Sequence, residues 1–384
     1  MEIRSSVFFE TVPLGTHSPA RRARPAWTPP NGAYQVELRA PADIGPELAA
    51  WQALANRAME PAIFADPDIL LPALQHLAEG RQPNLLLVWQ PTDSGRLLRG
   101  LFPVLMPRLR IVPGEVRLWR PSGFPLAPAL VDRDHGGAVL DAVFSFCASR
   151  GGRCSSFIFA GVAADGALAA AVGAGRRRSE ALPLPGLRGT RVPAEAQAER
   201  PTVKGAQLPG RAAHARAGAQ VRDAVESFLV VDAADAKVRG RMALIEDAGI
   251  ASFIRTMTRQ LARRGQCRVE ALRANGETVA AAIVLHGTDA VWLWRSAGRD
   301  GELDLLIGAI TAEAGRAGKR LIIANEVRVA PEIAAVLEPL AVADLLVSTR
   351  MGLSPSAAVT RLKTRIDRRL RAAASGGLQR LMRA

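Results

Sequence analysis

Apolar residues recur every three or four positions in two stretches of the second half of the chain, residues 221–229 and 250–261. This spacing puts them on one face of a helix, so each stretch predicts an amphipathic helix. Short apolar runs follow, and Asn275-Gly276 separates the first two of them. Both residues accept positive φ, so the dipeptide predicts a tight hairpin. The elements predicted after the two helices are strands over 266–272, 277–285 and 290–296, a helix over 303–317, a strand over 320–325, a helix over 331–340 and a strand over 343–349.

The first half mixes helical and alternating patterns in a similar way. Residues 34–38 alternate as a strand does, and apolar residues at helical spacing follow over 48–58 and 67–77. Pro67 suits the first turn of the second helix, where its missing N–H is not needed. The remaining predicted elements are strands over 84–90, 97–107 and 115–120, a helix over 137–149 and a strand over 155–159. Together the halves predict an α/β fold with a mixed α+β sheet.

The length of 384 residues exceeds what one hydrophobic core usually carries, so two domains are expected. A stretch of Gly, Arg, Pro and Ala clusters with little periodicity lies between them, which is typical of a boundary. The predicted organisation is a disordered lead-in over 1–32, an N-terminal domain over 33–172, a basic linker or crossover over 173–222, a C-terminal domain over 223–349 and a basic amphipathic C-terminal helix over 350–384.

The net charge of +14 is concentrated in two segments. Residues 171–222 hold ten Lys and Arg against three acids, and residues 350–384 hold nine against one. Neither segment contains Trp or Tyr, which single-strand-binding segments use to stack on bases, so the pattern argues against a nucleic-acid site. Within the second segment, apolar residues recur at helical spacing over 354–371. This basic helix is either docked on the protein or in peripheral contact with an anionic membrane.

The sequence argues against several other kinds of site. It has no H-E-x-x-H, G-x-S-x-G or P-loop motif, which excludes metalloprotease, α/β-hydrolase and NTPase chemistry at the motif level. Its three cysteines form no C-x-x-C pair, so we expect neither a disulfide framework nor a zinc site, and no metal is predicted. The longest weakly polar run, residues 160–175, contains Asp165 and is largely Ala and Gly, so no transmembrane helix is predicted. We expect a cytoplasmic protein.

A candidate phosphate site lies between the third predicted strand of the second half and the helix that follows. The connection carries two Arg and two Gly. Glycines allow close approach of the backbone to a ligand, and Arg can bind phosphate oxygens in a bidentate manner. The N–H groups and the dipole at a helix start also favour a phosphate. A plain connector is the alternative. The candidate cofactor-binding residues are Arg295, Ser296, Gly298, Arg299 and Gly301.

The order of three meandering strands, a crossover helix, a strand, a helix and a closing strand resembles the core of the GNAT acyltransferase fold. Residues 251–294, "ASFIRTMTRQLARRGQCRVEALRANGETVAAAIVLHGTDAVWLW", carry the resemblance most continuously. In the first half it rests on residues 51–77, "WQALANRAMEPAIFADPDILLPALQHL", with a Trp-bearing helix, an acidic-Pro step, a Phe and a second Pro-started helix. The chain resembles the CelD/BcsL-type group of GNAT acetyltransferases, linked to cellulose or exopolysaccharide biosynthesis. It is also similar in architecture to the Fem-type transferases.

This resemblance implies two tandem GNAT-like acyltransferase domains that use acetyl-CoA or another acyl-CoA as co-substrate. It implies N- or O-acetyl transfer to a saccharide or amino-sugar intermediate of envelope polysaccharide. The chain departs from the group's motifs, since Gly298-Arg299-Asp300 stands before the crossover helix where the group has Ser-Pro-Gly. A non-catalytic scaffold or binding protein with a degenerate GNAT fold is therefore one alternative. An aminoacyl-tRNA-dependent Fem-like transferase is another, and the oligomeric state stays open.

Acyl transfer to an amine or a hydroxyl needs a base for the acceptor proton and a proton donor to the departing thiolate. The single tyrosine, Tyr34, falls on the first strand, so a tyrosine acid in the second half is excluded. Each candidate base could equally be an ordinary surface or capping carboxylate. The candidates are Glu326, Asp300 and Asp232.

Four further residues of the second half have two readings each. Trp292 and Trp294 share a strand face and form either ordinary packing or the wall of an acyl or sugar pocket. Lys237, in the helix exit that the resemblance covers, is a candidate substrate contact. Cys267 opens a strand in an apolar context, which favours packing over nucleophilic chemistry. His286 lies in a tight turn, which favours a solvent-exposed residue over a base.

Overall fold

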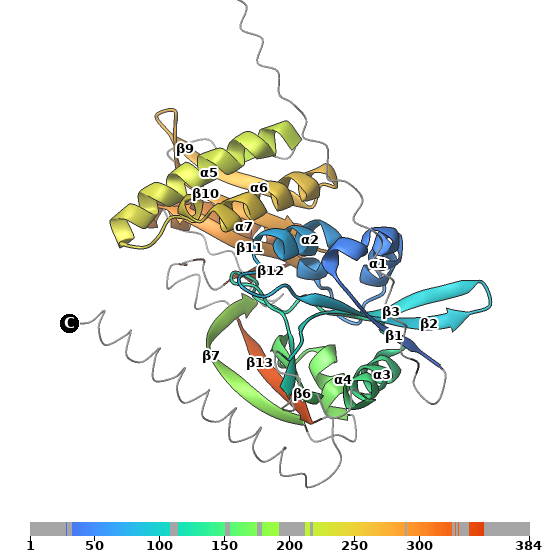
Figure 1. The fold of residues 1–384 in the computed structure, drawn as a ribbon. Helices are drawn as coiled ribbons and strands as arrows, with labels where there is room; N and C mark the ends of the chain where they lie inside the picture. Colours follow the sequence, from blue (N-terminus) through green and yellow to red (C-terminus); the bar gives the residue numbers. More distant parts are fainter. Residues whose placement is uncertain are drawn as a thin grey trace, which may run out of the picture.

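The computed structural model shows a mixed α/β protein, as the sequence predicts (Figure 1). Two predictions fall outside the described residues, Glu326 and the basic helix over 350–384, and so do residues 331–337 of the helix predicted over 331–340. The lead-in over 1–32 also lies outside them, apart from Thr28. The structure describes residues 33–107, 114–149, 154–174, 179–191, 212–215, 218–288, 290–324 and 338–348, together with Thr28, Val327 and Val329.

The first half begins with β1 (Gln35–Arg39), α1 (Leu48–Ala55) and α2 (Pro67–His76). Pro67 is the first residue of α2, and the Asp66 side chain caps this helix by accepting from the Asp68 N–H at 2.9 Å. The elements that follow are β2 (Asn84–Thr92), β3 (Gly95–Leu105), β4 (Gly114–Leu118), the short β5 (Leu130–Val131), α3 (Gly136–Ser149), β6 (Cys154–Ala163), α4 (Ala167–Ala174) and β7 (Ser179–Arg191).

The second half repeats this order. The predicted hairpin is confirmed, because Asn275 and Gly276 have φ of 52° and 84°. The elements are β8 (Ala212–Ala215), α5 (Gly218–Arg239), α6 (Ala248–Arg263), β9 (Cys267–Ala274), β10 (Glu277–His286), β11 (Ala290–Gly298), α7 (Asp300–Arg316), β12 (Arg320–Ile323) and β13 (Glu338–Ser348).

The sheet shows that the two halves are versions of one unit. In each half three antiparallel strands are followed by a crossover helix and a strand parallel to the third, β4 with β6 and β11 with β12. The hydrogen-bonded order is β1-β2-β3-β4-β6-β13-β7-β12-β11-β10-β9-β8, which gives the same series of equivalent strands from either end. At the centre the closing strands are exchanged: β13 of the second half pairs with β6, and β7 of the first half pairs with β12.

The structure differs from the sequence analysis around this exchange. The predicted linker over 173–222 contains β7 and β8, and β13 begins at Glu338, inside a predicted helix. The β7 segment SEALPLPGLRGTR has two prolines and two glycines, which weaken any local strand signal. Its strand depends on pairing with β13 along one edge and β12 along the other, and such long-range pairing leaves no periodic mark on the sequence.

One apolar core joins the halves. It includes Trp51 and Phe64 from the first half with Phe253 and Trp294 from the second. Helix α2 packs on α6 (Figure 1) so closely that a Cβ on Gly249 would lie 2.6 Å from a backbone oxygen of α2. A site built at this junction therefore has rigid walls from both halves. In the part of the chain that the structure describes, no helix is long and apolar enough to cross a membrane.

Candidate active site

The turn from β11 into α7 is short and closely packed. Only Arg299 lies between the last residue of β11, Gly298, and the first of α7, Asp300. Gly298 has φ of +145°, and a Cβ there would lie 2.7 Å from the Cβ of Ala280 on β10, so a side chain at this position would be strained. The N-cap residue, Arg299, makes no capping hydrogen bond through its side chain. Helix starts are common anion sites, because their first N–H groups have no partner within the helix.

A β-bulge precedes this turn. On β10, Val284 pairs with Leu293 while Ile283 pairs with Arg295, so Trp294 is an extra residue in β11. The Trp294 indole N–H donates to the Gly123 carbonyl at 2.9 Å, and the Arg295 guanidinium packs against the same glycine. Bulges re-aim side chains, and this one directs Trp294 and Arg295 at the first half. Arg295 therefore lies at the junction of the halves, while the Ser296 hydroxyl oxygen is buried.

An ion network joins the exit of α5 to the start of α7. Arg241 bridges Asp232 and Asp235 at 2.6 and 2.8 Å. Arg239 bridges Asp235 and Asp300, both at 2.7 Å. Asp232 and Asp300, two residues that the sequence singled out separately, are therefore linked in space by one chain of ion pairs.

The surroundings of the three predicted bases differ. Asp232 is buried, and its second oxygen accepts from the Leu244 N–H at 2.7 Å, so both of its oxygens hold the α5 exit in place. Asp300 is 72% exposed and pairs with Arg239. Both arrangements fit structural carboxylates rather than a poised base, and Glu326 lies outside the described residues. Lys237 is exposed in the last turn of α5, close in sequence to this network.

The two tryptophans of β11 belong to an aromatic cluster at the junction. The Trp292 ring stands edge-on to Phe64 at 5.2 Å between centroids, and the Trp294 ring to Phe253 at 5.8 Å. Phe124 lies between Phe64 and Phe253, at 5.0 and 5.9 Å. The packing interpretation holds for both rings, which are buried, and Trp292 also lines a pocket.

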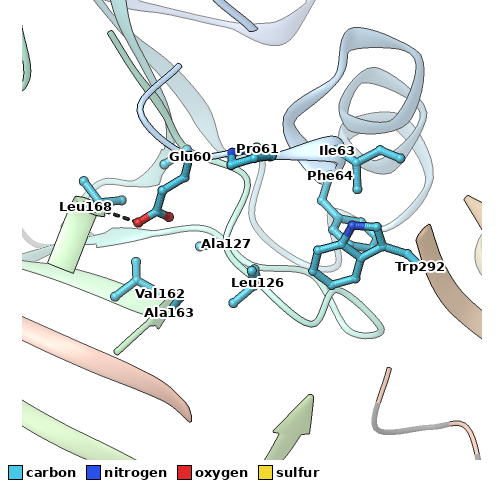
Figure 2. Close-up of a pocket in the computed structure, with 12 residues that line it drawn as sticks. Glu60, Pro61, Ile63, Phe64, Leu126, Ala127, Val162, Ala163, Leu168 and Trp292 are labelled. Atoms are coloured by element: carbon cyan, nitrogen blue, oxygen red, sulfur yellow. Dashed lines mark hydrogen bonds between the residues drawn. The ribbon is translucent and has the colours of Figure 1, made fainter. Parts of the chain in front are cut away.

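This junction pocket is small, with a cavity volume of about 20 Å³, and it is partly open to solvent. Figure 2 shows Glu60 and Trp292 at its opposite ends, with Pro61 and Phe64 along one side and Leu126 along the other. The remaining lining comes from the same two segments, residues 60–64 and 126–129, and from the end of β6 and the start of α4. Trp292 is the contribution of the second half, so the pocket forms only when the halves pack together.

Glu60 is the residue that the sequence analysis missed. Its carboxylate accepts from the Leu168 N–H at the start of α4 at 2.7 Å (Figure 2), and Gly166 gives it room to do so. Burial raises the pKa of Glu60, the Leu168 hydrogen bond opposes that rise, and the charge of Asp165 adds to it. A carboxyl group perturbed in this way inside a pocket is a candidate for proton transfer. Its signal in the sequence was the acidic-Pro step, of which it is the acidic residue.

The first half's own crossover helix, α3, starts in different surroundings. The connection to it, residues 119–135, contains Asp132, whose side chain is fully buried between Arg57 at 2.6 Å and Arg99 at 2.7 Å. Burial by itself would raise the pKa of Asp132, but the hydrogen bonds from Arg99 and Arg57 bring it below its ordinary value. The Tyr34 hydroxyl and His135 Nδ1 are 2.8 Å apart beside it. The chain itself thus fills the region before α3.

Two further predictions concern cysteine and metal chemistry. Cys267 is buried, and burial raises the pKa of its thiol to about 12, so it packs in the core and holds no thiolate at neutral pH. Among the residues with described positions, no group of three His, Cys, Asp or Glu side chains could hold a metal ion.

The chain was compared with known proteins. Residues 200–305 match the family model described as Acetyltransferase (GNAT) domain. This range runs from before α5 into the first turns of α7, so it includes the β11–α7 turn. No curated protein matches the chain. The match lies on the second half of the chain, which carries the β11–α7 turn.

Solved structures with a similar fold include FemX, at 8% identity over 77% of this chain and 95% of that one, with a TM-score of 0.50. A tandem GNAT protein from the clavulanic acid biosynthesis pathway matches at 16% identity, 83% and 99% coverage and a TM-score of 0.40. The C-terminal domain of a candidate lysylphosphatidylglycerol synthetase from Agrobacterium fabrum matches at 13% identity, 82% and 95% coverage and a TM-score of 0.47. At these identities the likeness concerns the fold alone.

Proposed function

We propose that the protein transfers an acyl group from acyl-CoA, with acetyl-CoA as the donor, and that the start of α7 binds the donor's pyrophosphate. The observation that carries this proposal is the one-residue connection between β11 and α7, at Arg299, whose side chain makes no capping hydrogen bond. Gly298 carries no side chain, so a ligand can approach the backbone closely at this turn. The dipole and N–H groups of a helix start favour a phosphate, and the acetyltransferase domain match includes this turn.

Some charged side chains around the β11–α7 turn favour a bound anion, and others oppose it. Arg299 is exposed at the helix start, and Arg239 reaches it from α5. Asp300 and Glu302 in the first turn of α7 oppose an anion, and the ion pair with Arg239 offsets the charge of Asp300. We therefore expect moderate donor affinity that weakens as ionic strength rises.

The part of β11 beyond its pairing with β12 gives the rest of the donor a place. All four residues of β12 pair with Ala290–Leu293 of β11, and β11 continues to Gly298 beside the α7 start. The pantetheine arm of CoA carries amide groups, which can hydrogen-bond along a strand edge. An arm laid along this part of β11 would run from the pyrophosphate at α7 back towards the junction of the halves.

The acceptor side of the proposal rests on the resemblance of residues 51–77 and 251–294 to the CelD/BcsL group. That resemblance supports a saccharide or amino-sugar acceptor, transfer to its nitrogen or oxygen, and a place in polysaccharide biosynthesis. The proposal also includes a cytoplasmic location and peripheral membrane contact through residues 354–371.

Calorimetric titration of the full chain with acetyl-CoA tests the donor site. Gly301→Asp adds a negative charge in the first turn of α7, at an exposed position where a Cβ meets nothing within 4 Å. We expect it to weaken binding at least tenfold without lowering the Tm, since a helix start tolerates an acidic residue. Gly308→Asp, in the same helix but further along and equally roomy, is the matched control and should bind like the wild type. A folded wild-type protein that binds no acetyl-CoA would contradict the proposal.

A further inference from the structure

We propose that the outer face of α5 and α6, together with the loop between them, docks on an anionic lipid bilayer. The outer face is defined here as the exposed residues between Gln220 and Arg263. This inference goes beyond the proposed acyl transfer, because it concerns a second partner of the protein, and it can be tested without acetyl-CoA.

Exposed large apolar side chains gather at the outer face. Among the described residues five such side chains are exposed, and four of the five lie between residues 230 and 245. They are Val230 at 66% exposure, Val238 at 86%, Met242 at 61% and Ile245 at 43%. Val238 lies in the last turn of α5, and Met242 and Ile245 lie in the loop that leads to α6. Single exposed apolar residues are ordinary on a protein surface, but a group of them marks an interaction site.

Arginines follow the exposed side of α6. Arg255, Arg259 and Arg263 are exposed and recur every four residues, so they lie along one side of the helix, while the other side is buried in the core. The Arg255 guanidinium binds both oxygens of Glu226 on α5, at 2.7 and 2.8 Å. The exposed sides of the two helices therefore adjoin, and Figure 1 shows α5 and α6 next to each other over the strands of the second half.

The outer face carries an excess of positive charge. Seven of its exposed side chains are Lys or Arg, and three are Asp or Glu. Two of the three carboxylates have partners within the chain, since Glu226 is paired with Arg255 and Glu246 accepts from the Ala243 N–H at 3.1 Å. Clusters of Lys and Arg are attracted to anionic lipid head groups within about a Debye length.

Cations also surround the exposed apolar side chains at the end of α5. Lys237 and Arg241 are exposed on either side of Val238. The nearby Asp232 and Asp235 are largely buried, with 2% and 7% of their side chains exposed, and both pair with Arg241. The surface presented to a partner at this end is therefore apolar and basic.

A lipid bilayer fits both features of the outer face. Its interface accepts side chains such as Val and Met, and anionic head groups attract the Lys and Arg around them. A second copy of the same face would bring like charges together. RNA would also attract the arginines, but the outer face has no exposed aromatic side chain on which bases could stack.

The apolar end of the outer face lies beside the β11–α7 turn. Arg239, the residue after Val238, pairs with Asp300, the first residue of α7, at 2.7 Å. A protein docked through Val238 and Met242 would therefore hold this turn close to the membrane surface.

Co-sedimentation of the full-length protein with lipid vesicles tests the inference. One kind of vesicle is phosphatidylcholine alone, and the other is phosphatidylcholine mixed with phosphatidylglycerol. We expect binding to the mixed vesicles roughly tenfold or more stronger than to the neutral ones, and binding that weakens as salt is added.

Matched variants separate the apolar and the basic contributions. Val238→Asp should weaken binding to the mixed vesicles about tenfold, because a charge replaces an apolar group at the interface. Leu97→Asp, at the fifth exposed large apolar residue, on β3, is its control and should bind like the wild type. Arg259→Gln should weaken binding about fivefold, since each cation near an anionic surface contributes to it. Arg133→Gln, at an exposed arginine of the first half, is the control for the lost charge.

A fluorescent label shows which part of the protein meets the bilayer. The three native cysteines are buried, so a cysteine introduced at an exposed position can be labelled selectively. A polarity-sensitive dye on Met242→Cys should shift its emission to the blue when mixed vesicles are added. The same dye on Leu97→Cys should not shift.

Four results would overturn the inference. They are no binding of the folded protein to mixed vesicles, equal binding to both kinds of vesicle, unchanged binding in Val238→Asp, and binding without a shift at Met242→Cys. The last result would place the contact elsewhere in the chain, such as in residues 354–371. Binding of transfer RNA in place of mixed vesicles would overturn it too. The proposed acyl transfer stands or falls separately, by the acetyl-CoA titration.

Discussion

The two crossover helices start in opposite surroundings, although they hold equivalent places in a repeated unit. Before α3 the chain supplies its own carboxylate, Asp132, and buries it between Arg57 and Arg99. Before α7 a single residue, Arg299, connects strand and helix, and its side chain makes no capping hydrogen bond. The duplicated fold thus provides two crossover connections, one with a buried ion network and one that is a single-residue turn.

The first half contributes to the second half's site in another way. Its loop over 119–127 receives the Trp294 indole and the Arg295 guanidinium at Gly123. Its acidic-Pro step places Glu60 in the junction pocket opposite Trp292. The first half thus contributes Gly123 to the surroundings of β11 and Glu60 to the junction pocket.

The largest expected effect is the loss of stability when the buried Asp132 ion pairs before α3 are removed. Asp132→Ala leaves two guanidinium groups without their carboxylate in a mostly buried place and should lower the free energy of unfolding by about 3 kcal/mol. Urea unfolding measures this free energy. The exposed Asp134→Ala is the matched control, and it should lower the free energy of unfolding by less than about 0.5 kcal/mol. Equal stability of the two variants would show that the ion pairs do not stabilise the first half.

The same carboxylate sets a pH dependence. The pKa of Asp132 is lower in the folded protein, so its contribution is fully present above the unfolded-state pKa, at about pH 4 and higher. That contribution is lost as pH falls through the folded-state pKa. Unfolding of the wild type between about pH 5 and pH 2 should therefore show a steeper loss of stability than Asp132→Asn does.

An intermediate effect on stability, together with loss of acetyl-CoA binding, is expected at Gly298 in the β11–α7 turn. Gly298→Ala must hold an alanine at φ of +145° with its Cβ near Ala280, so it should cost about 1–3 kcal/mol and abolish acetyl-CoA binding. Gly308→Ala in the same helix should instead stabilise by about 0.5–1 kcal/mol and leave binding unchanged. Thermal unfolding together with titration checks both, and wild-type affinity in Gly298→Ala would separate this turn from the donor.

The smallest expected effect comes from Asp300, the first residue of α7. Asp300→Asn removes a negative charge from the helix start and an exposed ion pair, so stability should change by less than about 1 kcal/mol. Acetyl-CoA affinity should rise roughly two- to fivefold at low salt, because a like charge near the phosphates is gone. The gain should fade at high ionic strength. Weaker binding in this variant would place the pyrophosphate elsewhere.

Much of the fold follows from local patterns. The amphipathic stripe of α6, the turn at Asn275-Gly276 and the apolar strands around it are encoded in adjacent residues, and they led to the two-unit GNAT-like fold. The exchange of β7 and β13 was not predicted, because it depends on pairing between segments more than a hundred residues apart. Residues Ala167–Ala174 (α4) are nearly all Ala, Val, Leu and Gly and give no helical periodicity.

The site residues also divide into those that local sequence predicts and those that depend on long-range packing. The β11–α7 turn was predicted because Gly298 and its neighbours are adjacent in sequence. Glu60 was not, because its burial and its partner Leu168 arise only once α4 packs beside it and Trp292 arrives from the other half. Asp232 and Asp300 have the residue type of a base, but their ion pairs with Arg241 and Arg239 could not be read from spacing.

The central claim, one donor site at the start of α7, is tested most directly by the stoichiometry of acetyl-CoA binding in two matched variants. Gly301 and Gly137 are each the second residue of a crossover helix, both exposed and with room for a side chain. We predict one acetyl-CoA per chain in the wild type and in Gly137→Asp, and none at the same concentrations in Gly301→Asp. Two molecules per chain, or loss of binding in Gly137→Asp with retention in Gly301→Asp, would contradict the account.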